Sequence, residues 1–179
     1  MGLELTKAQR VILINQMEIL KKLQPSKEEE YDKYIEILDR GYTPYYSEIF
    51  GEPDEELDKD ISRQVFDVFD MYQALYFDYQ NLTEDEREQI NEKDVLFKGY
   101  DGNNESQYSF AHFVVFEMER YKFIKELLDE GKIESMNSHR GMAGHYKELL
   151  NRYHRIREEN NKKHQRRLTL EQIKEVIGK

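Results

Sequence analysis

The sequence predicts an all-α fold, with an N-terminal helical hairpin packed with a second helical subdomain. Two long central helices are expected, at about 54–80 and 105–129. Three observations predict this fold class. Helix-capping patterns recur along the chain, apolar residues are spaced by three and four as one face of a helix requires, and no useful length of strand-like alternation occurs.

Four helix starts are marked by capping boxes, in which a Ser or Thr accepts from an amide three residues on and a Glu or Gln reaches back. The pairs are Thr6 with Gln9, Ser26 with Glu29, Thr83 with Glu86, and Thr169 with Gln172. They predict helices at about 7–23, 27–40, 84–91 and 170–177. Gly41 is placed to end the second of these as a left-handed cap.

The remaining helices are predicted from apolar spacing and proline. Thr43 and Pro44 predict a short helix that ends near Gly51. The helix at 54–80 should bury one stripe, formed by Leu57, Ile61, Val65, Val68, Tyr72, Leu75 and Tyr79, with Asp67, Asp70, Ala74 and Asp78 on the opposite side. The helix at 105–129 carries an apolar run from Phe110 to Phe116, so we expect it to be central and covered on most sides. A further helix is expected at about 142–158.

The length of 179 residues predicts one folding unit over 1–179, with possible subdomains at 1–80 and 81–179. Charged residues near the N-terminus leave neither a signal peptide nor a membrane span there, and the chain has no Cys, which removes disulfides and thiolate sites. We therefore expect a cytoplasmic protein with no membrane partner. Its net charge of −10 makes it acidic and disfavours broad nucleic-acid binding.

Several chemistries are excluded by missing motifs. The chain has no glycine-rich phosphate loop, no G-x-G-x-x-G, no G-x-S-x-G and no H-E-x-x-H. A calcium loop that began at Asp101 would need glycine at its sixth position and a bidentate Glu at its twelfth, where the chain has Ser106 and His112. The His residues in the last third are not spaced as zinc ligands on one helix. We expect no metal, no cofactor and no catalytic residues, although the question of an enzyme stays open.

A small-ligand site is one hypothesis. Gln16 falls inside the helical arc of Ala8, Ile12, Ile19, Leu20 and Leu23, where a buried amide must find partners. We expect a core Gln there, with ligand contact as the alternative. Glu117 falls in an aromatic arc, which would raise its pKa, and His112 shares a face with Glu119. With Arg120 and Tyr121 these residues form the candidate ligand or enzyme cleft, against a structural alternative.

A nucleic-acid site is a second hypothesis. The segment 152–167 carries seven basic residues against two acidic ones: Arg152, Arg155, Arg157, Lys162, Lys163, Arg166 and Arg167. Tyr153 beside them could stack on a base. The rest of the chain is strongly acidic, however, so we favour solvated or intersubunit charge over nucleic acid.

Self-association is the third hypothesis. The run Val11, Ile12, Leu13 and Ile14 covers all sides of the first helix, which a small two-layer monomer cannot easily bury. With Gln16, Tyr42, Tyr45 and Tyr46 it predicts an apolar interface and a homo-oligomer. An unidentified protein partner is also compatible with such a surface.

The sequence resembles the YfbU family of bacterial proteins, whose biochemical function is unassigned. The resemblance begins with Thr6, Ala8-Gln9-Arg10, Ile12-Leu13 and Asn15-Gln16, and continues at Arg40-Gly41-Tyr42. It resumes at Met71-Tyr72, Ala74-Leu75 and the block Val95, Phe97, Gly99-Tyr100-Asp101, and then at Phe113, Val115, Arg120-Tyr121, Tyr146 and Leu150. The resemblance covers nearly the whole chain and implies an all-α fold and oligomeric assembly, but no catalytic residues.

Taken together, these observations favour a self-associating protein-interaction or regulatory module. The alternatives are a small-ligand binder or enzyme at the cleft of Gln16, His112, Glu117 and Arg120, and a nucleic-acid-binding regulator through 152–167.

Overall fold

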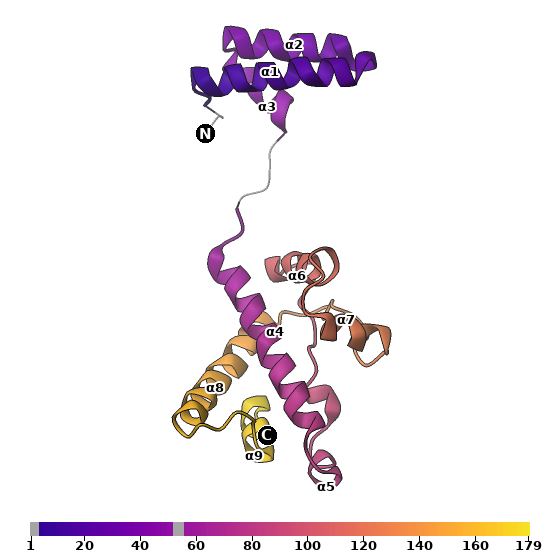
Figure 1. Cartoon of the computed structure of the whole chain (residues 1–179), viewed down its shortest axis with the longest axis vertical. Coiled ribbons are helices and arrows are strands. Elements are labelled where there is room, and N and C mark those ends of the chain that lie inside the picture. The colour runs from indigo at the N-terminus through magenta and orange to yellow at the C-terminus, as the bar shows by residue number, and fades with distance from the viewer. Residues whose placement is uncertain (1–3, 52–55) are drawn as a thin grey trace. The chain divides into compact units, whose positions relative to one another are not determined.

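The computed structural model describes residues 4–51 and 56–179, and its named elements are helices (Figure 1). Within this part of the chain the only β-type pairing is an isolated bridge between Tyr100 and Asn137. The predicted all-α fold is therefore confirmed. The α-helices are α1 (Lys7–Leu23), α2 (Glu28–Arg40), α3 (Tyr46–Phe50), α4 (Lys59–Gln80), α5 (Glu84–Arg87), α6 (Ser106–His112), α7 (Lys122–Asp129), α8 (Ala143–Lys162) and α9 (Leu170–Ile177).

The chain forms two compact units, residues 1–56 and 57–179. The sequence suggested a division after residue 80, but the boundary falls before α4 because that helix packs with α6, α8 and α9. The predicted start at about residue 54 lies outside the described part, and residues 56–58 are not helical, so α4 begins at Lys59. The Asp58 carboxylate caps α4 by accepting from the Asp60 N–H at 2.8 Å.

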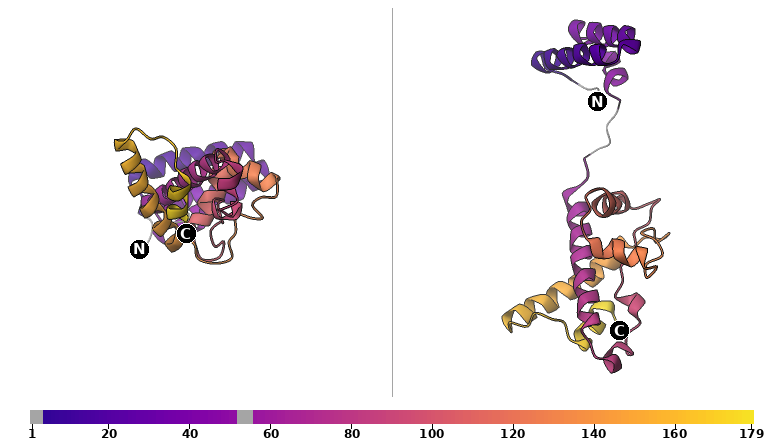
Figure 2. Two further views of the ribbon diagram at one scale, coloured as in Figure 1. Left: turned by 90° about the horizontal axis from the view of Figure 1, so that it is seen from below. Right: turned by 45° about the vertical axis from the view of Figure 1, so that its right-hand side comes forward.

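In the first unit, α1 and α2 lie side by side as the predicted hairpin, followed by α3 (Figures 1 and 2). Its buried core is small and consists of Met17, Tyr31, Leu38 and Tyr46. Partly buried apolar residues pack around these four, Leu13, Ile14 and Leu20 of α1 among them. The hairpin therefore rests on one narrow apolar seam.

Arg10 ties the two helices of the hairpin together at the end of α2. Its Nη1 donates to the carbonyl oxygens of Leu38 at 2.9 Å and Asp39 at 3.2 Å, which have no partners within the helix. Gly41 follows as the predicted left-handed cap, with φ of +71°. A Cβ at this position would lie 2.8 Å from the Arg10 Nη1, so a larger residue would have to displace the guanidinium as well as adopt the left-handed angle.

Three of the four expected capping boxes form, at Thr6, Thr83 and Thr169. The box at Ser26 does not form. Pro25 begins a 3-10 turn, Pro25–Lys27, and α2 then starts after Lys27 with no side-chain cap. The helix predicted at 84–91 is also shorter, since α5 ends at Arg87, whereas α8 runs on to Lys162 rather than to 158.

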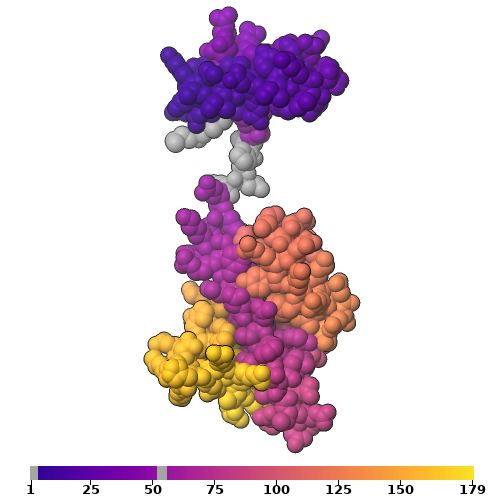
Figure 3. All heavy atoms as spheres, viewed as in Figure 1, coloured from indigo at the N-terminus to yellow at the C-terminus, as the bar shows by residue number. Residues whose placement is uncertain are grey.

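The second unit is built around α4, with α6 and α7 on one side and α8 and α9 on the other (Figures 1 and 3). Val65, Val68, Tyr72 and Leu75 of the predicted stripe are fully buried. Leu57, however, precedes the helix and is exposed. The central helix of the unit is α4 and not the segment 105–129.

Asp78 was expected on the outer side of this helix but is buried. Its Oδ2 accepts from the Leu168 N–H at 2.9 Å, which ties α4 to the start of the C-terminal segment. Burial raises the pKa of Asp78, and the bond from Leu168 opposes part of that rise. The sequence spacing gave no sign of this contact, because Leu168 is ninety residues further along the chain.

The long helix predicted at 105–129 is broken. After α6 the chain makes a π-helical turn, Phe113–Glu117, in which the Met118 N–H donates to the Phe113 carbonyl oxygen at 2.9 Å. Glu119 and Tyr121 then take left-handed backbone angles, with φ of +50° and +52°. The break places the Tyr121 ring 4.9 Å from that of Phe69, between centroids, and α7 begins in a new direction.

Glu105 supplies a cap that α8 lacks. The N-cap residue Met142 makes no side-chain bond, but the Glu105 Oε1 accepts from the N–H groups of Met142 and Ala143 at 2.7 and 2.6 Å. Its Oε2 accepts from the Asp101 N–H at 2.7 Å. One carboxylate thus joins the loop before α6 to the first turn of α8.

Candidate functional site

The exposed side of α1 is the most unusual surface of the first unit. Ile12, Ile19 and Leu23 are 65%, 59% and 72% exposed. At about 100° per residue they lie on one face. We call this the α1 outer face; its residues, all exposed, are Ala8, Ile12, Asn15, Gln16, Ile19 and Leu23. Much of the surface of the first unit in Figure 3 comes from α1.

The α1 outer face contains no charged side chain. Asn15 and Gln16 are its only polar members, and Glu18 and Lys22 border it on one side. The opposite side of the helix packs on α2 through Leu13, Met17 and Leu20. Helix α1 is therefore apolar on two separate faces, and the hairpin buries only one of them.

The expectation that Gln16 is a buried core residue is wrong. Gln16 is exposed because the arc that contains it points away from α2. The sequence showed the arc but not its direction, since the run Val11–Ile14 supplies apolar residues to both faces. Leu20, which was assigned to the same arc, packs on the core instead.

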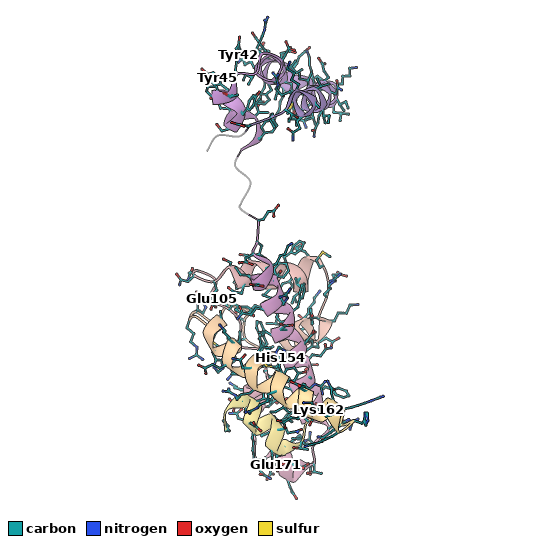
Figure 4. The ribbon with its side chains drawn as sticks, turned by 90° about the vertical axis from the view of Figure 1, so that its left-hand side faces the viewer. Tyr42, Tyr45, Glu105, His154, Lys162 and Glu171 are labelled. Atoms are coloured by element: carbon teal, nitrogen blue, oxygen red, sulfur yellow. The ribbon has the colours of Figure 1, made fainter. Side chains whose placement is uncertain are left out.

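The eight predicted interface residues divide between the surface and the core. Val11, Ile12 and Gln16 are exposed, while Leu13 and Ile14 are partly buried against the core. Tyr42 and Tyr45 are about half exposed and lie at the surface of this unit (Figure 4). Tyr46 was wrongly placed in the interface, because it is 2% exposed and belongs to the core.

Sequence reasoning missed Ile19 and Leu23 as surface residues. Their spacing of seven and eleven residues from Ile12 was the signal, but the same spacing also fits a core-facing stripe.

The residues of the predicted ligand cleft come from both units. Gln16 belongs to the first unit, whereas His112, Glu117, Arg120 and Tyr121 belong to the second. Glu117 was expected in an apolar arc, but the π-helical turn changes the helix phase and leaves it exposed. His112 is also exposed, with its ring 4.4 Å from that of Phe116, between centroids.

Arg120 and Tyr121 do line a shallow hollow of about 680 Å³, together with Phe66, Gln73, Lys122, Phe123 and Glu126. Neither His112 nor Glu117 reaches it. Burial raises the pKa of the Tyr121 phenol, and the neighbouring Asp70 adds to the rise. The ring stacks on Phe66 at 6.3 Å between centroids, so its contacts are those of a core residue.

The basic segment 152–167 is largely used for contacts within the second unit. The Arg152 Nε donates to the Val176 carbonyl oxygen at 2.9 Å, Arg155 pairs with Glu175, and the Arg157 Nη1 donates to the Arg166 carbonyl oxygen. Arg167 lies over the Phe77 ring, and Lys162 pairs with Glu158. Lys163 and Arg166 are exposed. The contacts of Arg152, Arg155 and Arg157 join α8 to α9 and to the loop between them.

In residues 4–51 and 56–179 no three or more His, Cys, Asp or Glu side chains are grouped as a metal site would require. None of the helices in the same ranges combines the length and apolarity needed to cross a bilayer.

These features define a small all-α protein made of a helical hairpin unit and a second unit packed around α4. The YfbU domain model matches residues 3–178, so the chain belongs to the YfbU family. It is also 33% identical over 147 residues to UPF0304 protein MJECS11 of Methanocaldococcus jannaschii, which covers 82% of this chain and 85% of that protein. Neither name states an activity.

The residues that carry the family resemblance have structural roles in both units. Arg10 and Gly41 close the end of α2, as described above. In the block around Gly99, the Tyr146 hydroxyl donates to the Gly99 carbonyl oxygen at 2.8 Å and accepts from the Lys98 N–H at 3.2 Å. Phe97, Tyr100 and Tyr146 pack as a buried aromatic cluster. The exposed Asn15 and Gln16 are different, because no core contact requires them.

Proposed function

We propose that this protein is a self-associating interaction module, in which the α1 outer face of one chain pairs with that of a second copy. One observation carries the proposal. Ile12, Ile19 and Leu23 lie on the same face of α1, and each of these residues is more than half exposed. Scattered apolar residues are common on protein surfaces, but a contiguous uncharged stripe along a helix favours a binding surface.

The small core of the first unit supports the same conclusion. Among the described residues of this unit, four apolar side chains are buried and nine more are partly buried around them, so its own core contributes limited stability. Small folds of this kind rely on disulfides, metals or oligomerisation. The chain has no Cys, so no disulfide can strengthen the hairpin. Pairing through α1 would add a second apolar seam to it.

The strength of the pairing can be bounded. Burying an Ile or Leu side chain contributes about 1.5–3 kcal/mol when burial is complete. The three residues are already partly covered, and association costs about 4–15 kcal/mol in lost freedom and ordering. Near the favourable end of these ranges, about 12 kcal/mol gained by two chains against about 5 kcal/mol lost corresponds to a dissociation constant on the order of 10 µM. We therefore expect a reversible dimer.

Light scattering coupled to size exclusion, over about 1–200 µM, tests the proposal across the affinity expected above. The wild-type chain should approach twice its 21.7 kDa mass at the upper end. Ile19→Glu should remain a monomer, because it places a charge in the centre of the interface. Met118→Glu is the matched control: it changes a similarly exposed apolar residue of the second unit and should dimerise normally.

A wild-type chain that stays monomeric throughout the range contradicts the proposal. Dimerisation of Ile19→Glu at the wild-type concentration contradicts it as well.

A further inference from the structure

The residues of the α1 outer face are arranged symmetrically about its midpoint. Three pairs of residues are centred on the same point, between residues 15 and 16: Ala8 with Leu23, Ile12 with Ile19, and Asn15 with Gln16. A two-fold axis beside the helix at that level, perpendicular to it, sets a second copy antiparallel and places each residue at the level of the other member of its pair. Apolar residues then face apolar residues, and amides face amides.

We infer that the two copies pair antiparallel, with the two-fold axis lying between the two α1 helices, perpendicular to them, at the level of Asn15 and Gln16. This inference rests on the proposed function and specifies its geometry. Ile12 of each chain then lies opposite Ile19 of the other, and the small Ala8 lies opposite the large Leu23. The interface is isologous, as expected for a closed dimer.

The two amides fix the axial alignment of the two helices, whereas side-chain volume and charge at the helix ends select the antiparallel direction. Asn15 and Gln16 are exposed in the single chain, but an apolar interface would bury them. A buried amide left without a partner opposes association, and each amide has both a donor and an acceptor. In the antiparallel register Asn15 meets Gln16 of the second copy, and symmetry repeats the pair. A polar pair of this kind fixes the alignment of packed helices.

The parallel arrangement fits less well. It sets Ala8 against Ala8 and Leu23 against Leu23, so one end has too little side-chain volume and the other too much. It also brings the exposed Lys22 of both chains to the same end. Antiparallel pairing separates the two copies of Lys22 and opposes the two helix dipoles.

Disulfide cross-linking tests the register directly, because the chain has no Cys of its own. The experiment uses two variants, Ile12→Cys and Ile19→Cys, which are prepared separately. They are mixed at about 200 µM, well above the expected dissociation constant, and oxidised mildly with copper phenanthroline. The mixture should form a disulfide dimer containing one of each variant. Each variant alone should give several-fold less, because like positions are about 10 Å apart along the axis, beyond disulfide reach.

Two further variants serve as controls. Asn15→Cys lies beside the axis and should cross-link to itself in either orientation, which verifies that the interface is formed. Glu36→Cys is exposed on α2 and should not cross-link.

The outcomes separate the orientation from the dimer itself. Strong self-linking of both Ile12→Cys and Ile19→Cys means a parallel dimer, which overturns this inference and leaves the proposed function standing. If Asn15→Cys fails to cross-link while light scattering shows a dimer, the interface lies elsewhere and both proposals are wrong. A monomer by light scattering, with no cross-linking in any variant, also rejects both.

Discussion

At the scale of single residues, several residues that carry the family resemblance are explained by the backbone geometry around them. Gly41 leaves space for Arg10, and Gly99 lies against the loop that follows α7. The Tyr100 N–H donates to the Met136 carbonyl oxygen at 2.9 Å, and the Ser138 N–H donates to the Tyr100 carbonyl oxygen at 3.0 Å. This pairing brings the two segments so close that a side chain at residue 99 has no room.

Gly99→Ala should therefore destabilise the second unit strongly. Its φ is +82°, and an added Cβ would lie 2.3 Å from the Met136 carbonyl oxygen, which is backbone and cannot move aside alone. We expect a loss of about 3–5 kcal/mol in the free energy of unfolding. Urea unfolding followed by circular dichroism measures it.

Gly131→Ala is the matched control. Its φ of +70° is similar, but an added Cβ meets nothing within 4 Å, so only the backbone strain of about 1–2 kcal/mol remains. If the two variants lose the same free energy of unfolding, the close approach to Met136 does not contribute to the cost of Gly99→Ala.

At the scale of elements, the largest departure from the sequence prediction is the break between α6 and α7. The apolar pattern of 105–129 fits one continuous helix locally. The folded unit instead contains a π-helical turn and two left-handed residues. Packing of Tyr121 against Phe66 and Phe69 offsets the backbone cost, and this contact with α4 is absent from any local pattern.

Glu119→Gly should stabilise the second unit, because Glu119 is exposed and its φ of +50° favours glycine. Relief of the left-handed strain exceeds the entropy that glycine adds to the unfolded chain, and we expect a gain of roughly 0.5–1 kcal/mol. Lys125→Gly, in the regular part of α7, should lose about 1 kcal/mol instead. Urea unfolding of both variants checks the sign. A loss at residue 119 would mean that its backbone carries no strain.

At the scale of the whole molecule, the two units differ in how much core they have. The second unit has a large buried cluster that spans α4 to α9, while the first has four buried apolar residues. If the α1 outer face pairs with a second copy, mass action stabilises the first unit and not the second.

Hydrogen exchange at two protein concentrations tests this difference. Between about 2 and 200 µM, amides of α1 and α2 should exchange more slowly as the dimer fills, and those of α4 and α8 should not change. Ile19→Glu should remove the concentration dependence. If the exchange rate of α1 in the wild-type chain does not change with concentration, self-association does not stabilise the first unit.

The sequence by itself determined the all-α class, the hairpin, three capping boxes and the buried stripe of α4. These follow from local rules of capping and periodicity that act within a few residues. The sequence also placed most residues of the α1 outer face in one arc of the helix. It did not show that this arc is exposed: Gln16 was predicted to be buried, and Ile19 and Leu23 were not recognised as exposed.

Only the tertiary structure decided which face of α1 points outward, because α1 has two apolar faces and α2 can cover just one. It likewise decided the break at 118–121, the burial of Asp78 and the use of Arg152, Arg155 and Arg157 within the unit. Each of these depends on a partner far away in the sequence, such as Phe69, Leu168 or Val176. Periodicity reports that a face is apolar, whereas packing selects the face that is buried.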